Sequence, residues 1–255
     1  MTSEIGSHFW RLIVSGPSDA ATNMARDEAI LLCAAASNGR ARGASATLRF
    51  YAWRPWAFSL GYFQKYEEFA AHAESGIPVV RRMTGGGAIY HADEITYSLV
   101  GPAGRCGFPR RAADIFEKVH AAIAGGLSSI GIDAELSDEP TGRSAPVCFE
   151  RPQKYDIVAG GRKLLGSAQR RHGGHFLQHG SLPLSANAFA PGATSVGQLV
   201  AKRPPDSTII DSLADALADS FGVVFVEGRL SDEEEAEAGR LAARKYASAE
   251  WNRKR

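Results

Sequence analysis

Residues 81–91 have the sequence RRMTGGGAIYH, and this glycine run with its flanks is the most informative stretch of the chain. Gly85, Gly86 and Gly87 stand between two strand-like segments. Because glycine has no Cβ, three in a row permit positive φ angles and let a ligand approach the main chain closely. The two preceding arginines add positive charge. A flexible hairpin turn is the simpler explanation of a bare glycine triplet, and a Walker loop is excluded because no Gly-Lys-Ser/Thr follows.

Strands and helices are predicted on both sides of the glycine run, without a regular βαβ alternation. This mixture favours an α+β fold, a mixed β-sheet with helices packed on one side of it. We expect one domain over 1–255 with a short helical C-terminal extension at about 207–255. The expected strands are Phe9 to Val14, Thr47 to Trp53, Ala57 to Leu60, Val79 to Arg82, Ile95 to Val100, Tyr155 to Ala159, Lys163 to Ala168 and Phe176 to Leu184. The expected helices are Ser18 or Asp19 to about Ala36, Ala112 to about Leu127, Asp211 to Phe221 and Asp232 to about Ser248.

Two further segments also combine glycine with charged or polar residues. Residues 154–171 contain KYDIV followed by GRKLLGSAQRR, and residues 177–182 have the sequence LQHGSL. Each alone could be a turn with a solvated charged flank. In this order, after the glycine run, they resemble the lipoate-protein ligase, octanoyltransferase and biotin-ligase superfamily. The resemblance covers roughly Trp10 to Leu184.

This resemblance implies the biotin/lipoate-protein ligase catalytic-domain fold, in which the sheet forms a groove for a medium-length acyl chain. Lys163 would reach the acyl carbonyl, although a lysine in such a hairpin is otherwise usually solvated. Either His91 or His179 would orient the loops or the ligand. The substrate-binding residues that the resemblance implies are Arg82, Thr84, Gly85, Gly86, Gly87, His91, Gly166, Ser167, Ala168, His179 and Gly180.

Members of the superfamily differ in how they activate the acid. Ligases make an acyl-adenylate from ATP, whereas transferases start from an acyl thioester and pass through a cysteine. Here PVCFE at 146–150 lies in a long loop, Asp138 to Pro152, and resembles the Cys-Phe stretch of the ligase-like bacterial octanoyltransferases. No cysteine follows Cys148, which excludes the arrangement of the smaller lipoyl(octanoyl) transferases.

The implied reaction moves octanoate from octanoyl-acyl carrier protein, through a thioester on Cys148, to a lysine of glycine-cleavage H protein or an E2 lipoyl domain. A thiolate is needed, and a nearby ammonium such as Lys163 would lower the thiol pKa from about 8.5. Backbone N–H groups near Gly166 to Ala168 are candidate oxyanion donors. Lys163 could also take the proton of the acceptor amine. No cofactor is expected.

Other thiols and the histidines are weaker candidates. An inert loop thiol is the alternative for Cys148; Cys33 lies on an apolar helix and is expected in the core, and Cys106 is a rival loop thiol. The His172-Gly-Gly-His175 pair lacks a helix to align it and a carboxylate to complete it, so no metal site is expected.

The formal net charge is +1, from 29 Lys and Arg against 28 Asp and Glu, which does not indicate a nucleic-acid-binding protein. No secretory signal or membrane-length apolar run is visible, and three cysteines do not make a disulfide framework, so a cytoplasmic location is expected. A basic rim would steer acidic carrier domains by charge, unless it is an ordinary solvated surface. The rim candidates are Arg105, Arg110, Arg111, Arg162, Arg170 and Arg171.

Three rival functions remain open at this point. An ATP-dependent lipoate ligase is disfavoured because only about seventy residues follow Leu184, although a partner on a separate chain is conceivable. An amidotransferase would take octanoate from H protein to E2 domains by similar cysteine chemistry. A non-catalytic acyl-binding module would keep the groove but not the turnover.

Overall fold

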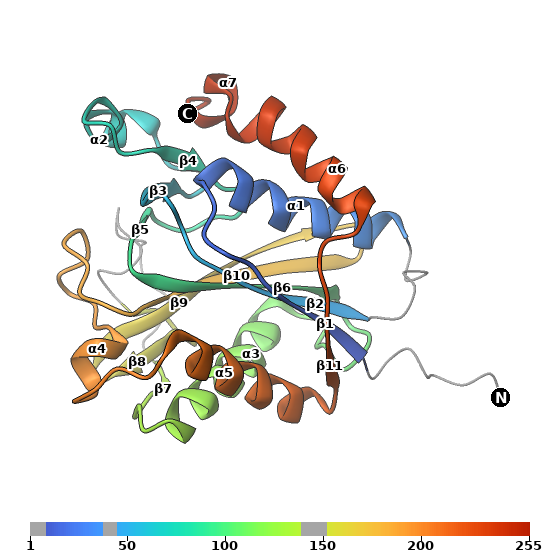
Figure 1. Cartoon of the computed structure of the whole chain (residues 1–255), viewed down its shortest axis with the longest axis vertical. Helices are drawn as coiled ribbons and strands as arrows, with labels where there is room; N and C mark the ends of the chain where they lie inside the picture. Colours follow the sequence, from blue (N-terminus) through green and yellow to red (C-terminus); the bar gives the residue numbers. More distant parts are fainter. Residues whose placement is uncertain (1–8, 38–44, 139–151) are drawn as a thin grey trace.

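A large mixed sheet organises the protein in the computed structural model, which describes residues 9–37, 45–138 and 152–255 (Figure 1). Three strands at one side of the sheet run parallel and the remaining neighbours pair antiparallel. The α+β prediction is confirmed. In spatial order the strands are β11 (Val224–Glu227), β1 (Phe9–Val14), β2 (Ala46–Tyr51), β6 (Glu94–Pro102), β10 (His175–Pro183), β9 (Arg162–His172), β8 (Ile157–Ala159) and β7 (Glu135–Leu136).

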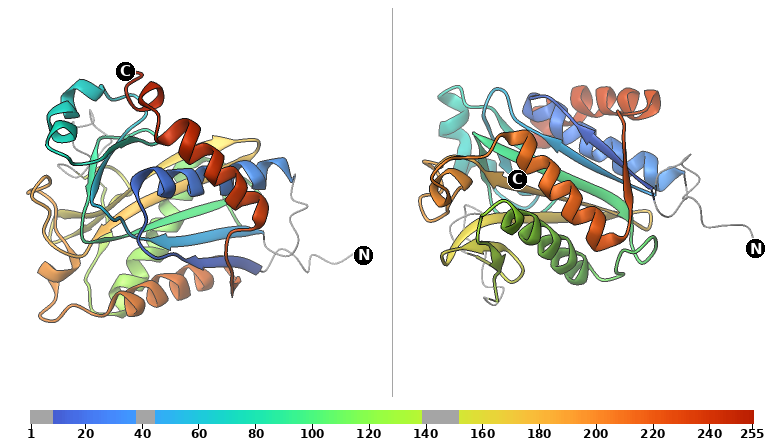
Figure 2. Two further views of the ribbon diagram at one scale, coloured as in Figure 1. Left: turned by 45° about the horizontal axis from the view of Figure 1, so that its top comes forward. Right: turned by 60° about the horizontal axis from the view of Figure 1, so that its bottom comes forward.

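Helices cover both faces of this sheet, so the prediction that they pack on one side is wrong. α1 (Ala20–Ala36) and α6 (Asp232–Leu241) lie on one face, and α3 (Ala112–Ser129) and α5 (Asp206–Phe221) lie on the other (Figure 2). Along β6, Leu99 joins the apolar cluster of α3 and α5, while its neighbour Val100 packs with residues of α1. Every residue of β6 and β10 is buried, so these strands lack the polar alternation that would have marked an exposed face.

The helix ends follow local chemistry. The Asp19 side chain accepts a hydrogen bond from Thr22 N and begins α1, as predicted. The glycines Gly125 and Gly126 do not end α3, which continues to Ser129. A Cβ on Gly126 would lie 2.8 Å from the Ser212 carbonyl oxygen of α5. This glycine therefore permits the close approach of two helices.

A small second sheet carries the glycine run. In it β3 (Ala57–Leu60) pairs in parallel with β4 (Val79–Arg81) and antiparallel with β5 (Ile89–His91). Because β4 and β5 lie on opposite sides of β3, the glycine run crosses between them and is not a hairpin turn.

The C-terminal region is more varied than the predicted helical extension. It adds the strand β11, which pairs in parallel with β1, and α6 begins with a capping box between Ser231 and Glu234. The expected helix to Ser248 ends at Leu241 and continues as a π-helical turn, Ala242–Tyr246, and the short α7, Ala249–Asn252. The buried Glu28 of α1 accepts hydrogen bonds from Lys245 and Tyr246, which fix this region across α1. Among the described helices, none is long and apolar enough to cross a membrane.

Candidate active site

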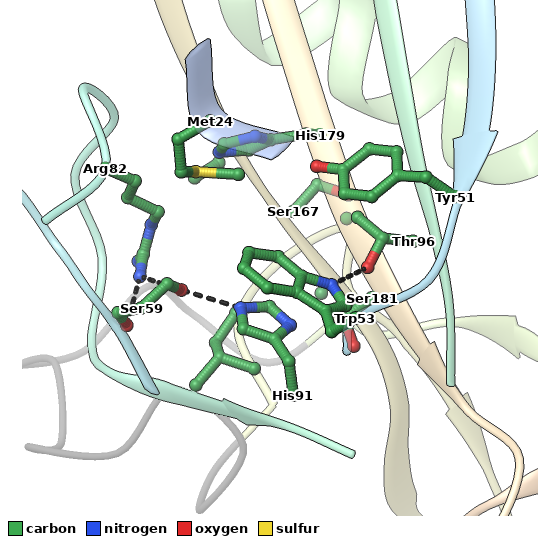
Figure 3. Close-up of a pocket in the computed structure, with 14 residues that line it drawn as sticks. Met24, Tyr51, Trp53, Ser59, Arg82, His91, Thr96, Ser167, His179 and Ser181 are labelled. Atoms are coloured by element: carbon green, nitrogen blue, oxygen red, sulfur yellow. Dashed lines mark hydrogen bonds between the residues drawn. The ribbon is translucent and has the colours of Figure 1, made fainter. Parts of the chain in front are cut away.

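A pocket opens on the α1 face of the sheet, between the small sheet and strands β9 and β10 (Figure 3). Its apolar wall comes from Met24, Tyr51, Trp53 and Ile89. Seven of the residues predicted to bind substrate line it, and they come from the glycine-run segment, β9 and β10. These residues are Arg82, His91, Gly166, Ser167, Ala168, His179 and Gly180.

Arg82 shapes the glycine run. Its guanidinium donates to the carbonyl oxygens of Gly85 at 2.6 Å and Gly87 at 2.7 Å, and to the Ser59 carbonyl at 2.9 Å. The buried side chain therefore folds the run against β3. The glycine run packs closely against the end of β3, because a Cβ on Gly61, the residue after β3, would lie 1.8 Å from the Gly86 carbonyl oxygen.

A buried carboxylate, Glu94, organises one wall of the pocket. It accepts hydrogen bonds from His91 Nδ1 at 2.7 Å, Thr96 Oγ1 at 2.5 Å and Ser181 Oγ at 2.6 Å. The His91 ring stacks on Trp53 with centroids 3.7 Å apart. Because a carboxylate only accepts, His91 carries a proton on Nδ1, and the ring is fixed in both plane and tautomer.

A second buried charge network supports the opposite wall. His179 lies between Asp27 Oδ2, 3.2 Å from Nδ1, and Thr84 Oγ1, 2.8 Å from Nε2. Asp27 also accepts from Arg49 at 2.8 Å and Ser98 at 2.7 Å. Burial alone would raise the pKa of Asp27, but the His179 hydrogen bond and the Arg49 charge hold that pKa below its usual value. Burial lowers the pKa of His179, which favours its neutral form.

Lys163 lies beside the pocket with 3% of its surface exposed. Its Nζ pairs with Asp156 Oδ2 at 2.7 Å. A Cβ on Gly166 would lie 2.4 Å from Lys163 Cε and 2.6 Å from Nζ, so the glycine leaves room for the amine against the strand. This explains why a Gly follows the Lys at this spacing.

A β-bulge aims Lys163 at that position. Ile157 pairs with Leu165, but Val158 pairs with Lys163, which leaves Leu164 as the extra residue. Leu164 and Leu165 both join the apolar cluster of α3 and α5. Side chains normally alternate along a strand, so if the same residues paired regularly Lys163 and Gly166 would face opposite ways. The bulge places them on one face.

Cys148 lies outside the described residues. The chain is described to Asp138 and again from Pro152, and both flanks are tied to Asp156. Ser137 N donates to the Asp156 carbonyl, and Gln153 N donates to Asp156 Oδ2, the oxygen that also binds Lys163. The segment that contains Cys148 therefore leaves and rejoins the fold beside the Lys163–Asp156 pair.

Ser167 and Gly180 link the pocket to the other face of the sheet. Ser167 Oγ lies 2.7 Å from Tyr97 Oη and 2.7 Å from Nε2 of His120 in α3. Burial lowers the pKa of His120, and the Tyr155 carbonyl accepts from its Nδ1. A Cβ on Gly180 would lie 2.2 Å from Ser167 Oγ, so this glycine makes space for the hydroxyl.

The remaining thiols and histidines are placed away from the pocket. Burial, with nearby glutamates of α6, raises the pKa of Cys33 to about 11, which opposes a reactive thiolate. Cys106 occupies a loop with φ of 52°. Within the described ranges no group of three or more His, Cys, Asp or Glu could hold a metal ion. Of the rim arginines, Arg162 donates to carbonyl oxygens at 191–193 and Arg171 to the Arg110 carbonyl.

Sequence reasoning missed the charged partners that hold the site. Asp27, Arg49, Glu94 and Asp156 are all buried; the first three are fixed by contacts between elements far apart in the chain, and Asp156 pairs with Lys163 across the β8–β9 hairpin. Their one local sign is a charge in an otherwise apolar stretch, such as Arg49 in a strand buried at every position. That sign does not identify the partner.

Comparison with known proteins identifies the family of this chain. The family model "Lipoyl protein ligase A/B catalytic domain" matches residues 19–220. Octanoyltransferase LipM of Moorella thermoacetica is 37% identical and aligns over 96% of this chain and 98% of its own. The LipM of Kyrpidia tusciae is 34% identical over 95% and 98% of the two chains. The chain therefore belongs to the lipoyl protein ligase A/B catalytic-domain family.

Solved structures show the same fold. A putative lipoate protein ligase from T. acidophilum with bound lipoic acid superposes with a TM-score of 0.81, 27% identity, and coverage of 96% of this chain and 99% of that one. Lipoate-protein ligase A bound with ATP gives a TM-score of 0.81 and 26% identity, with coverage of 95% and 98%. Given its full-length similarity to octanoyltransferases, the protein is an acyltransferase of the octanoyltransferase kind, active in lipoate biosynthesis.

Proposed function

We propose that this protein transfers octanoate from octanoyl-acyl carrier protein, through a thioester on Cys148, to a lysine of glycine-cleavage H protein or an E2 lipoyl domain, in the cytoplasm. One observation carries the proposal. The Lys163 ammonium is held beside an aromatic pocket by Asp156, and the same carboxylate oxygen receives Gln153 N at the end of the Cys148 segment.

The proposed reaction has two exchanges. The Cys148 thiolate attacks the donor carbonyl, the bond between that carbon and the donor sulfur breaks, and the carrier leaves as a thiolate. The neutral amine of the target lysine then attacks the acyl-cysteine, the bond between the acyl carbon and the Cys148 sulfur breaks, and the amine proton passes to solvent as the amide forms and the Cys148 thiolate leaves. The first exchange replaces one thioester by another, so it needs no ATP.

Chain connectivity is compatible with a meeting of Cys148 and Lys163. Cys148 stands five residues before Gln153, a length of at most about 17 Å when extended. The Gln153 amide and the Lys163 ammonium bind one oxygen atom, so they are neighbours. A fixed cation at this place would stabilise the thiolate and the charge that develops on the carbonyl. Its ion pair with Asp156 favours this electrostatic role over proton removal.

Oxyanion donors are proposed from the edge of β9. β8 pairs with β9 only as far as Leu165, and from Gly166 onward no strand in the described part of the chain covers that edge. Backbone N–H groups of Gly166 to Ala168 that point toward this edge are available to a ligand. Met24, Trp53 and Ile89 supply the apolar contact that an eight-carbon chain requires.

The test separates the two exchanges. Purified protein is mixed with octanoyl-acyl carrier protein without ATP, and the intact mass is followed before and after addition of apo H protein. We expect an octanoyl adduct that is abolished in Cys148→Ala, kept in the matched Cys33→Ala and Cys106→Ala controls, and discharged to H protein. Undiminished labelling of Cys148→Ala would refute the covalent step.

The rival activities are distinguished by the same components. Transfer that requires free octanoate and ATP would identify a ligase. Transfer that occurs only from octanoyl-H protein to E2 would identify an amidotransferase. Absence of transfer in every combination would leave an acyl-binding module. Chain length does not decide between ligase and transferase, because the two solved ligase chains described above are covered over 98–99% of their length.

A further inference from the structure

A cluster of three cations surrounds an aromatic loop near the pocket. We call Tyr62, Phe63, Arg170, Lys254 and Arg255 the Tyr62 patch. Lys254 Nζ lies 3.8 Å from the Tyr62 ring centre, and the guanidinium carbons of Arg170 and Arg255 each lie 5.6 Å from it. Phe63 is 67% exposed and also faces Arg255 at 5.4 Å. The patch joins the loop after β3, the strand β9 and the segment after α7.

The charge of this patch comes from three cations, Arg170, Lys254 and Arg255. None of its three cations pairs with a carboxylate in residues 9–37, 45–138 or 152–255. Their side chains are exposed, and they gather although the whole chain has a net charge of only +1. Like charges held together over an exposed aromatic ring are typical of a surface that binds an acidic partner.

Two hydrogen bonds connect the patch to the pocket wall. Tyr62 N donates to the Thr84 carbonyl, and the Thr84 hydroxyl contacts His179 in the pocket wall. Arg170 stands two residues beyond Ala168, which also lines the pocket. The C-terminus, α7 and α1 lie on the same face of the large sheet (Figure 1). A protein that covers the patch would therefore also cover the pocket mouth.

We propose that the Tyr62 patch is the docking surface for the acyl acceptor, a small acidic domain that presents the target lysine. This proposal rests on the proposed function. A lysine side chain reaches only roughly 6 Å from its Cα, so the acceptor must dock in contact with the pocket mouth. The three cations steer and orient the acidic domain, and Tyr62 and Phe63 supply the apolar centre of the contact.

Charge reversal tests the surface. In Arg170→Glu/Lys254→Glu/Arg255→Glu at low salt, we expect kcat/KM for an apo lipoyl-accepting domain to fall at least about tenfold, through KM, with kcat retained. The difference should shrink as salt rises, because exposed charges are screened. Phe63→Ala should raise KM by a smaller factor that does not depend on salt. Octanoylation of a short peptide whose only charged side chain is the target lysine should be unchanged in both variants, which also shows that they are folded.

The matched control reverses equal charge elsewhere. Of the rim candidates, Arg105, Arg110 and Arg111 lie in the loop between β6 and α3 and are not among the pocket-lining residues, so we assign them to the ordinary solvated surface. For Arg105→Glu/Arg110→Glu/Arg111→Glu we therefore expect wild-type KM for the acceptor domain. An equal effect of both triple variants, or no effect of the first, would overturn the proposal. A rise in KM for octanoyl-acyl carrier protein alone would assign the patch to the donor and overturn it as well. A wild-type protein that octanoylates the peptide but no lipoyl-accepting domain would refute the proposed function itself.

Discussion

The two faces of the large sheet differ in chemistry although the same strands build them. Toward α3 and α5, the strands present Trp10, Leu48, Phe50 and Leu99 to a continuous apolar cluster. Toward α1, the alternate residues include Arg49, Thr96 and Ser98, which bind buried carboxylates. One face buries hydrocarbon and the other buries paired charge.

This difference separates stability from binding. Apolar burial is non-directional and tolerates some repacking, whereas a buried ion pair has a defined geometry and is costly to break. The pocket lies on the charged face, where Asp27 and Glu94 fix the rings of His179 and His91. We infer that the apolar face holds the sheet together and that the charged face holds the pocket in shape.

The largest effect is expected where a buried charge loses its partner. Arg49→Met leaves the Asp27 carboxylate without its cation, and we expect about 3–5 kcal/mol of destabilisation in urea unfolding near neutral pH. On the other face Leu99→Ala should cost about 2–5 kcal/mol through the cavity it leaves. The two losses of stability differ in their dependence on pH. The Arg49→Met cost should shrink in acid as Asp27 becomes protonated, and a cost independent of pH would contradict the role given to Asp27.

A loss of activity without a comparable loss of stability is expected at Gly166. The added methyl group of Gly166→Ala would displace the Lys163 amine, since its Cβ would lie 2.4 Å from Cε. Misplacement of a catalytic group by about 1 Å can cost roughly a hundredfold, and we expect at least that loss in octanoyl transfer. Gly239→Ala, on exposed α6 with open space around the new methyl, is the matched control and should retain wild-type turnover. Near-normal turnover of Gly166→Ala would show that the amine position is not critical.

Each face buries one histidine whose pKa is lowered by burial, His179 on the pocket side and His120 under α3. As the pH falls below the ordinary histidine pKa of 6.5, these two histidines take up protons in the unfolded state but remain neutral in the native state. The stability that the two neutral histidines contribute is therefore complete above about pH 6.5 and is lost as the pH falls. Unfolding free energy measured from pH 8 to 5 should therefore decline below about 6.5. His179→Gln and His120→Gln should each flatten the decline. The exposed His172→Gln should not, and an unchanged slope in both buried variants would contradict the prediction.

The smallest effects come from two adjacent glycines in α3, the helix that covers the apolar face. A Cβ on Gly125 meets open space, so Gly125→Ala should stabilise by about 0.5–1 kcal/mol through helix propensity. In Gly126→Ala the new methyl would press on the Ser212 carbonyl, and destabilisation is expected instead. Thermal unfolding of the pair measures the difference, and a gain in both would mean that α3 and α5 can separate without cost.

Elements with a strong local signal were predictable from sequence, and features fixed by distant contacts were not. The Asp19 cap and the spacing of apolar residues locate α1, and the hairpin of β8 and β9 follows from its paired glycines. The strand β11 was missed because four residues, mostly exposed, give little pattern beside β1. The second helical layer was missed because strands buried on both faces show no alternation.

The site follows the same rule. Seven of the predicted residues line one pocket, and they could be predicted because they lie in contiguous motifs, whereas Thr84, the glycine run and Lys163 are not among its lining residues. Asp156 was quoted within a motif, yet its pairing with Lys163 depends on a register irregularity that no periodicity reveals. The Tyr62 patch joins three segments of the chain, and more than eighty residues separate one segment from the next. No local sequence pattern therefore predicts the patch.

The extra residue in β9 lets Leu164 and Leu165 both stay under the sheet while the amine of Lys163 stays on the pocket side. If the same residues paired regularly with β8, Leu164 would stand opposite Ile157, and Lys163 and Gly166 would face opposite ways. Deletion of Leu164 would have a milder result, because it leaves Lys163 and Gly166 two positions apart in a regular strand, on one face, and removes one leucine from the apolar cluster. The hairpin should therefore tolerate a single-codon deletion at this place better than a change that forces regular pairing on the complete strand.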